Sequence, residues 1–264
     1  MWKWRGPGRP GSSTARGPRP RPSRRAPRHI DSILVQSRGI PFPINVQRLI
    51  EGIHKFRNDE FGHYEELFQR LARDGQNPHT LFITCSDSRV LAELITQSKP
   101  GDLFVVKNVG NIVPPHDSAS SAISTGAAIE FAVGSLGVED IVVCGHSQCG
   151  AMRALIEAPD LSSMPNLEEW LSLAQPVRDT VLQRYQHLEE PEHRYNAAAE
   201  ENVLFALENL KTFPCVQKRL EEGTLSLHGW YFKIASAELY AYDPNTKQFA
   251  PFGEEWQPDL PAEQ

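Results

Sequence analysis

Long apolar runs are missing from this 264-residue sequence. None approaches the roughly 18 apolar residues that a transmembrane helix needs, and no apolar segment of a secretory signal peptide precedes the body of the chain. Cysteine is scarce, with only Cys85, Cys144, Cys149 and Cys215. In the absence of a signal peptide, these four favour free thiols in a reducing compartment over a disulfide framework. We therefore expect a soluble cytoplasmic protein without membrane contact.

Acidic residues are missing from residues 1–28, which carry eight Arg and one Lys. Residues 29–264 then hold 18 basic and 33 acidic side chains, a balance of −15 that the overall charge of −6 conceals. Nucleic acid repels a body of this charge, so the composition argues against nucleic-acid binding.

Residues 1–28 also have almost no apolar content and are rich in Arg, Pro, Gly and Ser, which predicts disorder. Three interpretations remain open: a transit peptide, a basic arm for an acidic partner, and a dispensable tail upstream of the true start. Pro and Gly disfavour the amphipathic helix of a transit peptide, so the last is favoured. We expect the folded domain over residues 46–252 and a flexible acidic tail over 253–264.

No internal repeat is present, and apolar runs alternate with helical patterns. Strands are expected at residues 81–83, 103–106, 141–143, 224–230 and 239–242. Helices are expected at residues 46–71, 90–95, 118–136, 148–156, 166–188 and 195–210. This alternation predicts an α/β fold with a mostly parallel sheet in the order 2-1-3-4, an antiparallel fifth strand and flanking helices.

Chemically capable side chains follow two of these strands. Cys85, Asp87 and Arg89 come directly after the first strand, and His146 and Cys149 come after the third. In the order 2-1-3-4, the crevice of the sheet opens between strands 1 and 3 at their carboxyl ends. The motifs and the topology therefore predict one site. A lone Cys is more often a small buried hydrophobe, but the two motifs together form a strong joint signal. Cys144, within a strand, and Cys215, away from either motif, are expected to be inert.

Two thiolates and one imidazole suit tetrahedral zinc, and three protein ligands leave a fourth position for water. Zinc lowers the pKa of bound water from about 15.7 towards about 7 and so supplies hydroxide, although two thiolates make that drop smaller. Asp87 can either close the site as a fourth ligand, or pair with Arg89 and accept the hydrogen bond of the hydroxide. His228 is expected to be a satisfied polar residue near a strand end.

At these residues the sequence resembles a β-class carbonic anhydrase, from about Gln47 to Phe252. The resemblance lies in the segments 85–89, 108–111, 125–130, 145–150 and 228–230. Segments 48–52 and 225–243 are most similar to the branch found in cyanobacterial carboxysomes, whose long C-terminal extension this chain lacks.

The resemblance implies zinc held by Cys85, His146 and Cys149, with Asp87 and Arg89 as the gating pair. It also implies a carbon dioxide pocket in which Gln76 donates a hydrogen bond to a substrate oxygen. The remaining pocket residues that it implies are Phe104, Val109, Phe131 and Gly150. Many relatives have Tyr at the position of Phe131, so a hydroxyl is absent there. The family forms dimers, or dimers of dimers, through its N-terminal helices.

The leading hypothesis is zinc-dependent reversible hydration of CO₂ to bicarbonate and a proton, by way of zinc-bound hydroxide. Hydrolysis of carbon disulfide or carbonyl sulfide on the same scaffold is the first alternative. An inactive, zinc-stabilised scaffold protein is the second, and it would need neither Asp87, Arg89 nor Gln76. A carboxysomal location remains open beside the cytoplasmic one.

Overall fold

The computed structural model of the protein describes residues 44–116 and 123–252. Our expectations for residues 1–28 and 253–264, and for the start of the 118–136 helix, lie outside these ranges. The chain divides into two units, residues 1–60 and 61–264, which are described separately. No helix in the described ranges has both the length and the apolar character needed to cross a membrane.

The first unit contains helix α2 (Ile44–Lys55) and the π-helical turn η2 (Phe56–Glu60). Leu49 and Ile53 lie one helical turn apart on α2 and are 68% and 65% exposed. The predicted helical pattern over residues 46–71 falls on three consecutive helical segments, because the π-helical turn η2 lies in sequence between α2 and α3 (Phe61–Asp74). An uncovered apolar stripe on α2 follows from these exposures.

The second unit is built on one sheet of six strands in the order β2-β1-β3-β4-β5-β6. The strands are β1 (Thr80–Cys85), β2 (Leu103–Asn108), β3 (Asp140–His146), β4 (Ser226–Lys233), β5 (Glu238–Asp243) and β6 (Gln248–Pro251). β2, β1, β3 and β4 are parallel, whereas β5 and β6 are antiparallel. The predicted order and the antiparallel fifth strand are confirmed, and β6 was missed.

Helix α9 (Pro191–Leu210) lies against β3 and β4 and forms one side of the core. Two glycines allow this close approach. A Cβ at Gly145 or at Gly229 would come within 2.9 Å of a Val203 methyl group. All six residues of β1 are buried, as expected of a central parallel strand covered on both faces. Thus β1 and β3, which end at the predicted site, lie at the centre of the sheet.

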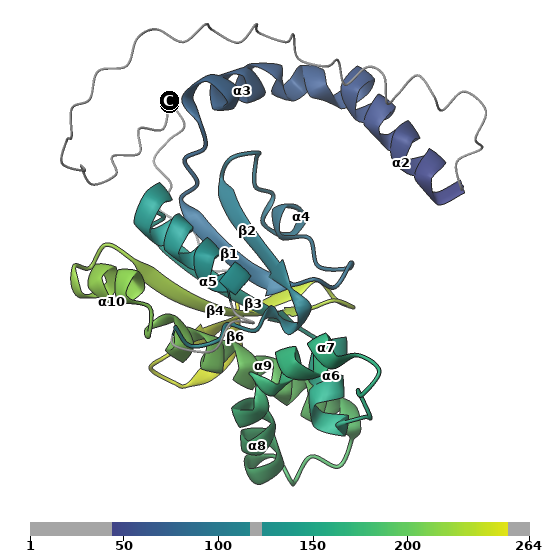
Figure 1. Cartoon of the computed structure of the whole chain (residues 1–264), viewed down its shortest axis with the longest axis vertical. Helices are drawn as coiled ribbons and strands as arrows, with labels where there is room; N and C mark the ends of the chain where they lie inside the picture. The colour runs from purple at the N-terminus through teal and green to yellow at the C-terminus, as the bar shows by residue number, and fades with distance from the viewer. Residues whose placement is uncertain (1–43, 117–122, 253–264) are drawn as a thin grey trace, which may run out of the picture. The chain divides into compact units, whose positions relative to one another are not determined.

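The remaining helical segments are α4 (Ala92–Thr96), η3 (Val109–Asn111), α5 (Ile123–Glu130), η5 (Phe131–Leu136), α6 (Gly150–Glu157), α7 (Pro165–Ser172), α8 (Gln175–Arg184) and α10 (Pro214–Glu221). The single helix predicted over 166–188 is wrong, because α7 and α8 are separate. Pro176 has no N–H to donate and therefore suits the first turn of α8 rather than a helix interior. Helix α10, which begins at Pro214, was missed. Figure 1 shows α6, α7 and α8 gathered with α9 below the sheet.

A cavity of about 550 Å³ between α8, α9 and strands β4 to β6 is lined in part by Glu200. Burial raises the pKa of Glu200 to about 7, from an ordinary value of 4.5, although the Lys233 ammonium opposes the shift and Glu201 adds to it. The folded protein therefore binds more protons than the unfolded chain between these two pH values. The contribution of Glu200 to the free energy of unfolding is fully present below pH 4.5 and is lost progressively as the pH rises to about 7.

The Glu200→Gln variant should remove this penalty. We expect it to be more stable than the wild type by about 1–3 kcal/mol at pH 8 and equally stable near pH 4.5, since one pKa unit corresponds to about 1.4 kcal/mol and partial exposure reduces the effect. Urea unfolding at the two pH values measures the difference. Glu66→Gln, at an exposed position on α3, is the matched control and should show no such pH-dependent gain. A gain of equal size at both pH values would contradict the assignment to Glu200.

Candidate metal centre

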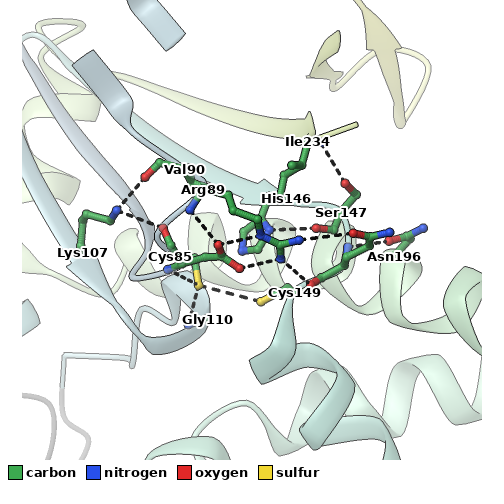
Figure 2. A network of polar contacts seen from close by, with 12 residues as sticks. Cys85, Arg89, Val90, Lys107, Gly110, His146, Ser147, Cys149, Asn196 and Ile234 are labelled. Atoms are coloured by element: carbon green, nitrogen blue, oxygen red, sulfur yellow. Dashed lines mark hydrogen bonds and ion pairs between the residues drawn. The ribbon is translucent and has the colours of Figure 1, made fainter. Parts of the chain in front are cut away.

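The ends of two neighbouring parallel strands bring three side chains together. Cys85 is the last residue of β1 and His146 the last residue of β3. Cys149 follows three residues after His146, at the N-cap position of α6. Figure 2 shows the sulfur atoms of Cys85 and Cys149 turned toward one another. The predicted convergence at the carboxyl ends of strands 1 and 3 is therefore what the fold produces.

The three side chains are buried and their ligand atoms converge. Exposure is 5% for Cys85, 0% for His146 and 1% for Cys149. One ligand atom from each lies within 4.8 Å of the other two, and the two Sγ atoms are 4.0 Å apart. Within residues 44–116 and 123–252, no second group of His, Cys, Asp or Glu side chains meets in this way. The separation fits three donors around one ion.

The imidazole of His146 is oriented with one nitrogen free. Its Nδ1 lies 2.9 Å from the carbonyl oxygen of Ser147, which can only accept, so Nδ1 carries the proton. Nε2 is buried and has no hydrogen-bond partner among the described residues. A buried nitrogen lone pair without a partner is costly in a folded protein, and a metal ion would satisfy it.

Without a nearby cation, the thiols of Cys85 and Cys149 are not both deprotonated, because each sulfur shifts the pKa of the other. The pKa of Cys85 is lowered, first by the thiol of Cys149 and then by His146 and the backbone N–H groups of Asp87 and Gly110, although burial opposes the shift. The pKa of Cys149 is raised by the neighbouring Cys85 sulfur and by burial. A second thiolate is therefore stable here only beside a cation. Because Cys is a metal ligand as the thiolate, the pair is suited to a divalent ion.

Asp87 lies in the turn after β1 and is fully engaged by Arg89. Its Oδ1 accepts hydrogen bonds from the Arg89 backbone N–H at 2.9 Å and from Nε at 3.0 Å, and its Oδ2 accepts one from Nη2 at 2.8 Å. The Arg89 guanidinium holds the pKa of Asp87 well below its usual range. Asp87 is therefore an ionised acceptor beside the converging ligand atoms, and its orientation is set by Arg89.

Comparison with known proteins gives a consistent family. The sequence profile described as "Carbonic anhydrase" matches residues 80–239. The chain is 47% identical over 199 residues to a carbonic anhydrase of Synechocystis sp., which covers 75% of this chain and 71% of the relative. It superposes on the β-carbonic anhydrase CcaA with a TM-score of 0.74, at 45% identity over 78% of this chain and 99% of that one. The chain belongs to the β-class carbonic anhydrases.

A second similar structure is a tetrameric β-carbonic anhydrase of Sordaria macrospora, with a TM-score of 0.61, at 32% identity over 75% of this chain and 93% of that one. Membership in the β-carbonic anhydrases makes this chain a zinc-dependent lyase that hydrates carbon dioxide reversibly to bicarbonate and a proton. The donor set of two thiols and a partnerless imidazole nitrogen fits zinc in its own chemistry as well.

Several supporting contacts of this β-carbonic anhydrase site escaped the sequence analysis. The Gly110 N–H donates to Cys85 Sγ at 3.3 Å. The turn that carries it is held by Trp170, whose Nε1–H donates to the Val109 carbonyl at 2.7 Å, and by Asn202, whose Nδ2 donates to the Gly110 carbonyl at 2.9 Å. These partners lie 61 and 92 residues away in sequence, so no local pattern marks them.

The turn that carries Asp87 and Arg89 is likewise braced from β2. Lys107 Nζ donates to the Val90 carbonyl at 2.6 Å and to the Asp87 carbonyl at 3.2 Å. The ammonium group of Lys107 therefore holds the backbone of the turn that carries the Asp87 carboxylate.

The predicted substrate residues are less closely gathered than the metal-ligand residues. Gln76 is exposed and its side chain makes no hydrogen bond to a described residue. The rings of Phe104 and Phe131 pack against one another, with their centroids 5.8 Å apart. Val109, by contrast, is 43% exposed and lines a separate cavity of about 430 Å³ next to Trp170.

Gly150, the last of the predicted pocket residues, begins α6 and is exposed.

Three further predictions concern residues outside the metal-ligand group. His228 is paired with Asp140 at 2.7 Å, which confirms a satisfied polar residue. Cys144 is fully buried and its pKa is raised by burial to about 12, and Cys215 also stands apart from the metal-ligand group.

Proposed function

We propose that Cys85, His146 and Cys149 hold the catalytic zinc of this β-carbonic anhydrase, and that Asp87 and Arg89 control its fourth position. The observation that carries the proposal is the convergence of two buried sulfur atoms on a buried imidazole nitrogen that has no hydrogen-bond partner among residues 44–116 and 123–252. Zinc, when bound, supplies a Lewis acid that brings the pKa of a coordinated water towards neutrality.

The chain itself contributes orientation and proton acceptance. Asp87 is kept ionised by Arg89, so it can accept a hydrogen bond from the attacking water and point the oxygen lone pair at the substrate carbon. Because both Asp87 oxygens are bound by Arg89, the carboxylate is also held back from the metal. We therefore favour the state in which Asp87 gates the site over the state in which it closes it.

Carbon dioxide is apolar and needs an apolar wall with few polar anchors. We propose that Val109 supplies part of that wall and that Gln76 donates to a substrate oxygen. Phe104, Phe131 and Gly150 complete the proposed pocket. The exposure of Gln76 in the single chain supports a pocket to which two chains contribute.

Stopped-flow measurement of CO₂ hydration on the purified, zinc-loaded protein tests the proposal, with carbonyl sulfide as a second substrate on the same preparation. We expect rapid CO₂ hydration that depends on Asp87 and little hydrolysis of carbonyl sulfide. Carbonyl sulfide turnover without CO₂ hydration would assign the protein to the alternative hydrolase, and turnover of neither substrate would favour the scaffold.

We further propose that the active unit is a homodimer, alone or paired into a tetramer. The uncovered stripe of Leu49 and Ile53 on α2 supports this, because monomers rarely expose such patches. The tetrameric assembly of the Sordaria macrospora relative supports the larger form.

On dilution, the hydration rate per chain should fall at the concentration at which the mass drops to one chain, since dissociation removes the shared pocket. Light scattering and stopped-flow rates on one dilution series measure both. Leu49→Ser should shift both curves to higher concentration, whereas Glu51→Ser, an exposed position on the same helix, should leave them in place. A monomer with full activity would contradict the shared pocket.

A reducing compartment such as the cytoplasm, or a carboxysome within it, is the location that we propose. Two free sulfur atoms only 4.0 Å apart would be exposed to disulfide formation before zinc is loaded in an oxidising compartment. In such a compartment, the enzyme would serve carbon utilisation by interconverting CO₂ and bicarbonate.

A further inference from the structure

Gln148 has an unusual backbone conformation at the centre of the metal site. It lies between His146 and Cys149, and its φ angle is 57°, in the left-handed region that non-glycine residues seldom adopt. Such a conformation costs free energy with a Gln side chain and would cost less with Gly. A residue that remains in it beside two metal-ligand residues invites a functional explanation.

The hydrogen bonds of Gln148 join it to Arg89 of the gating pair and to Asn196 on α9. Arg89 donates through Nη1 to the Gln148 side-chain Oε1 and through Nη2 to the Gln148 backbone carbonyl, each at 3.3 Å. The Gln148 N–H donates to Oδ1 of Asn196 on α9, also at 3.3 Å. Figure 2 shows this network running from Arg89 to Asn196. One residue thus offers two acceptors to the same guanidinium.

Arg89 needs a second support besides Asp87. Its side chain is 45% exposed, and an exposed ion pair alone holds a long side chain weakly. Asp87 occupies Nε and Nη2 of the guanidinium, whereas the one hydrogen bond of Nη1 within the described chain goes to Gln148. In this left-handed turn, both the carbonyl and the side-chain amide oxygen of Gln148 face Arg89.

We propose that Gln148 is a positioning residue that anchors the far side of the Arg89 guanidinium and so keeps Asp87 off the zinc. This inference rests on the proposed gating role of Asp87 and Arg89. It explains why Gln remains at a position that backbone energetics assign to Gly, since Gly offers a carbonyl but no side-chain acceptor.

The test separates the backbone of residue 148 from its side chain. Gln148→Gly relieves the left-handed strain and removes the amide, Gln148→Asn tolerates the conformation but has a shorter reach, and Gln148→Glu keeps an acceptor of full length. We expect the Gly variant to melt at or above the wild-type temperature, to retain one zinc per chain, and to lose about three- to tenfold in kcat/KM, as suits the loss of one modest hydrogen bond. The Asn variant should behave similarly, and the Glu variant should recover the wild-type rate.

Crystal structures of the zinc-loaded variants give a readout independent of activity. In the Gly variant, Arg89 should leave Asp87 in part of the molecules, and the freed carboxylate should approach the metal. In the Glu variant, the wild-type pairing should return. A Gly variant with wild-type kcat/KM and an undisturbed pair of Asp87 and Arg89 would overturn the inference. If Arg89→Ala were itself fully active, the proposed gating would fail instead, so the two failures are distinguishable.

Discussion

Serine in place of Cys149 should leave the protein without bound zinc and should lower CO₂ hydration by at least about a thousandfold, because the metal supplies most of the activation of water. The hydroxyl group of Ser does not ionise near neutral pH and cannot replace a thiolate. Only His146 and one sulfur would then remain, too few donors for a site that uses three. Zinc content by mass spectrometry of the metal and stopped-flow hydration measure the two losses together. Cys85→Ser should behave in the same way.

Cys215→Ser is the matched control, because Cys215 is half-buried and stands outside the metal-ligand group. It should retain one zinc per chain and the wild-type rate. Full zinc retention in both Cys85→Ser and Cys149→Ser would contradict the assignment of the ligands.

Alanine in place of Arg89 should abolish most of the activity while leaving the metal bound. Without the guanidinium, Oδ2 of Asp87 loses its partner and Oδ1 keeps only the backbone N–H of residue 89, so the carboxylate becomes free to turn toward the fourth position on zinc. We expect hydration at neutral pH to fall by about a hundredfold or more, as suits the loss of an oriented proton acceptor. Zinc content should stay near one per chain, in contrast to the cysteine variants.

Arg73→Ala provides a control with similar chemistry. Arg73 pairs with Asp74 at 2.9 Å on the exposed surface of α3, so its loss removes an ion pair of similar length without touching the site. That variant should hydrate CO₂ at the wild-type rate. Near-normal hydration by Arg89→Ala across neutral pH would show that Asp87 needs no such restraint.

The sequence predicted the core of the site because its signals are local. Cys85 and Asp87 lie at the end of one buried strand, and His146 and Cys149 lie at the end of another. The two residues of each pair are only two or three positions apart, so they stay close together in any fold. Parallel strands that are neighbours in the sheet carry their carboxyl ends to the same edge, so the order 2-1-3-4 was sufficient to join the two motifs. Their roles as zinc ligands remain a prediction that the variants above test.

The supporting contacts could not be predicted in this way. Trp170 and Asn202 reach the turn at Val109 and Gly110 from separate helices, and Lys107 reaches the Val90 carbonyl from β2. Such contacts depend on how helices pack against the sheet, which a single sequence does not encode in any short pattern. The left-handed backbone conformation of Gln148 could not be predicted either, because the residue is neither Gly nor Asn, the two types that usually indicate it.

One wrongly joined helix and one missed helix are each marked by a proline in the sequence. Pro176 lies inside the helix predicted over 166–188, where a proline normally ends or begins a helix, and it opens α8 in the structure. Pro214 opens α10 in the same manner. Strand β6 is different, because four residues that end in Pro251 give almost no periodicity. Its existence depends on pairing with β5.

Titration of zinc into the metal-free protein, followed by stopped-flow CO₂ hydration at each step, tests most directly whether one zinc on Cys85, His146 and Cys149 performs the reaction. Activity should rise in proportion to the zinc added and should saturate at one zinc per chain, and the Cys149→Ser protein should show no rise. Hydration by the metal-free protein, or saturation at a different stoichiometry, would contradict the account.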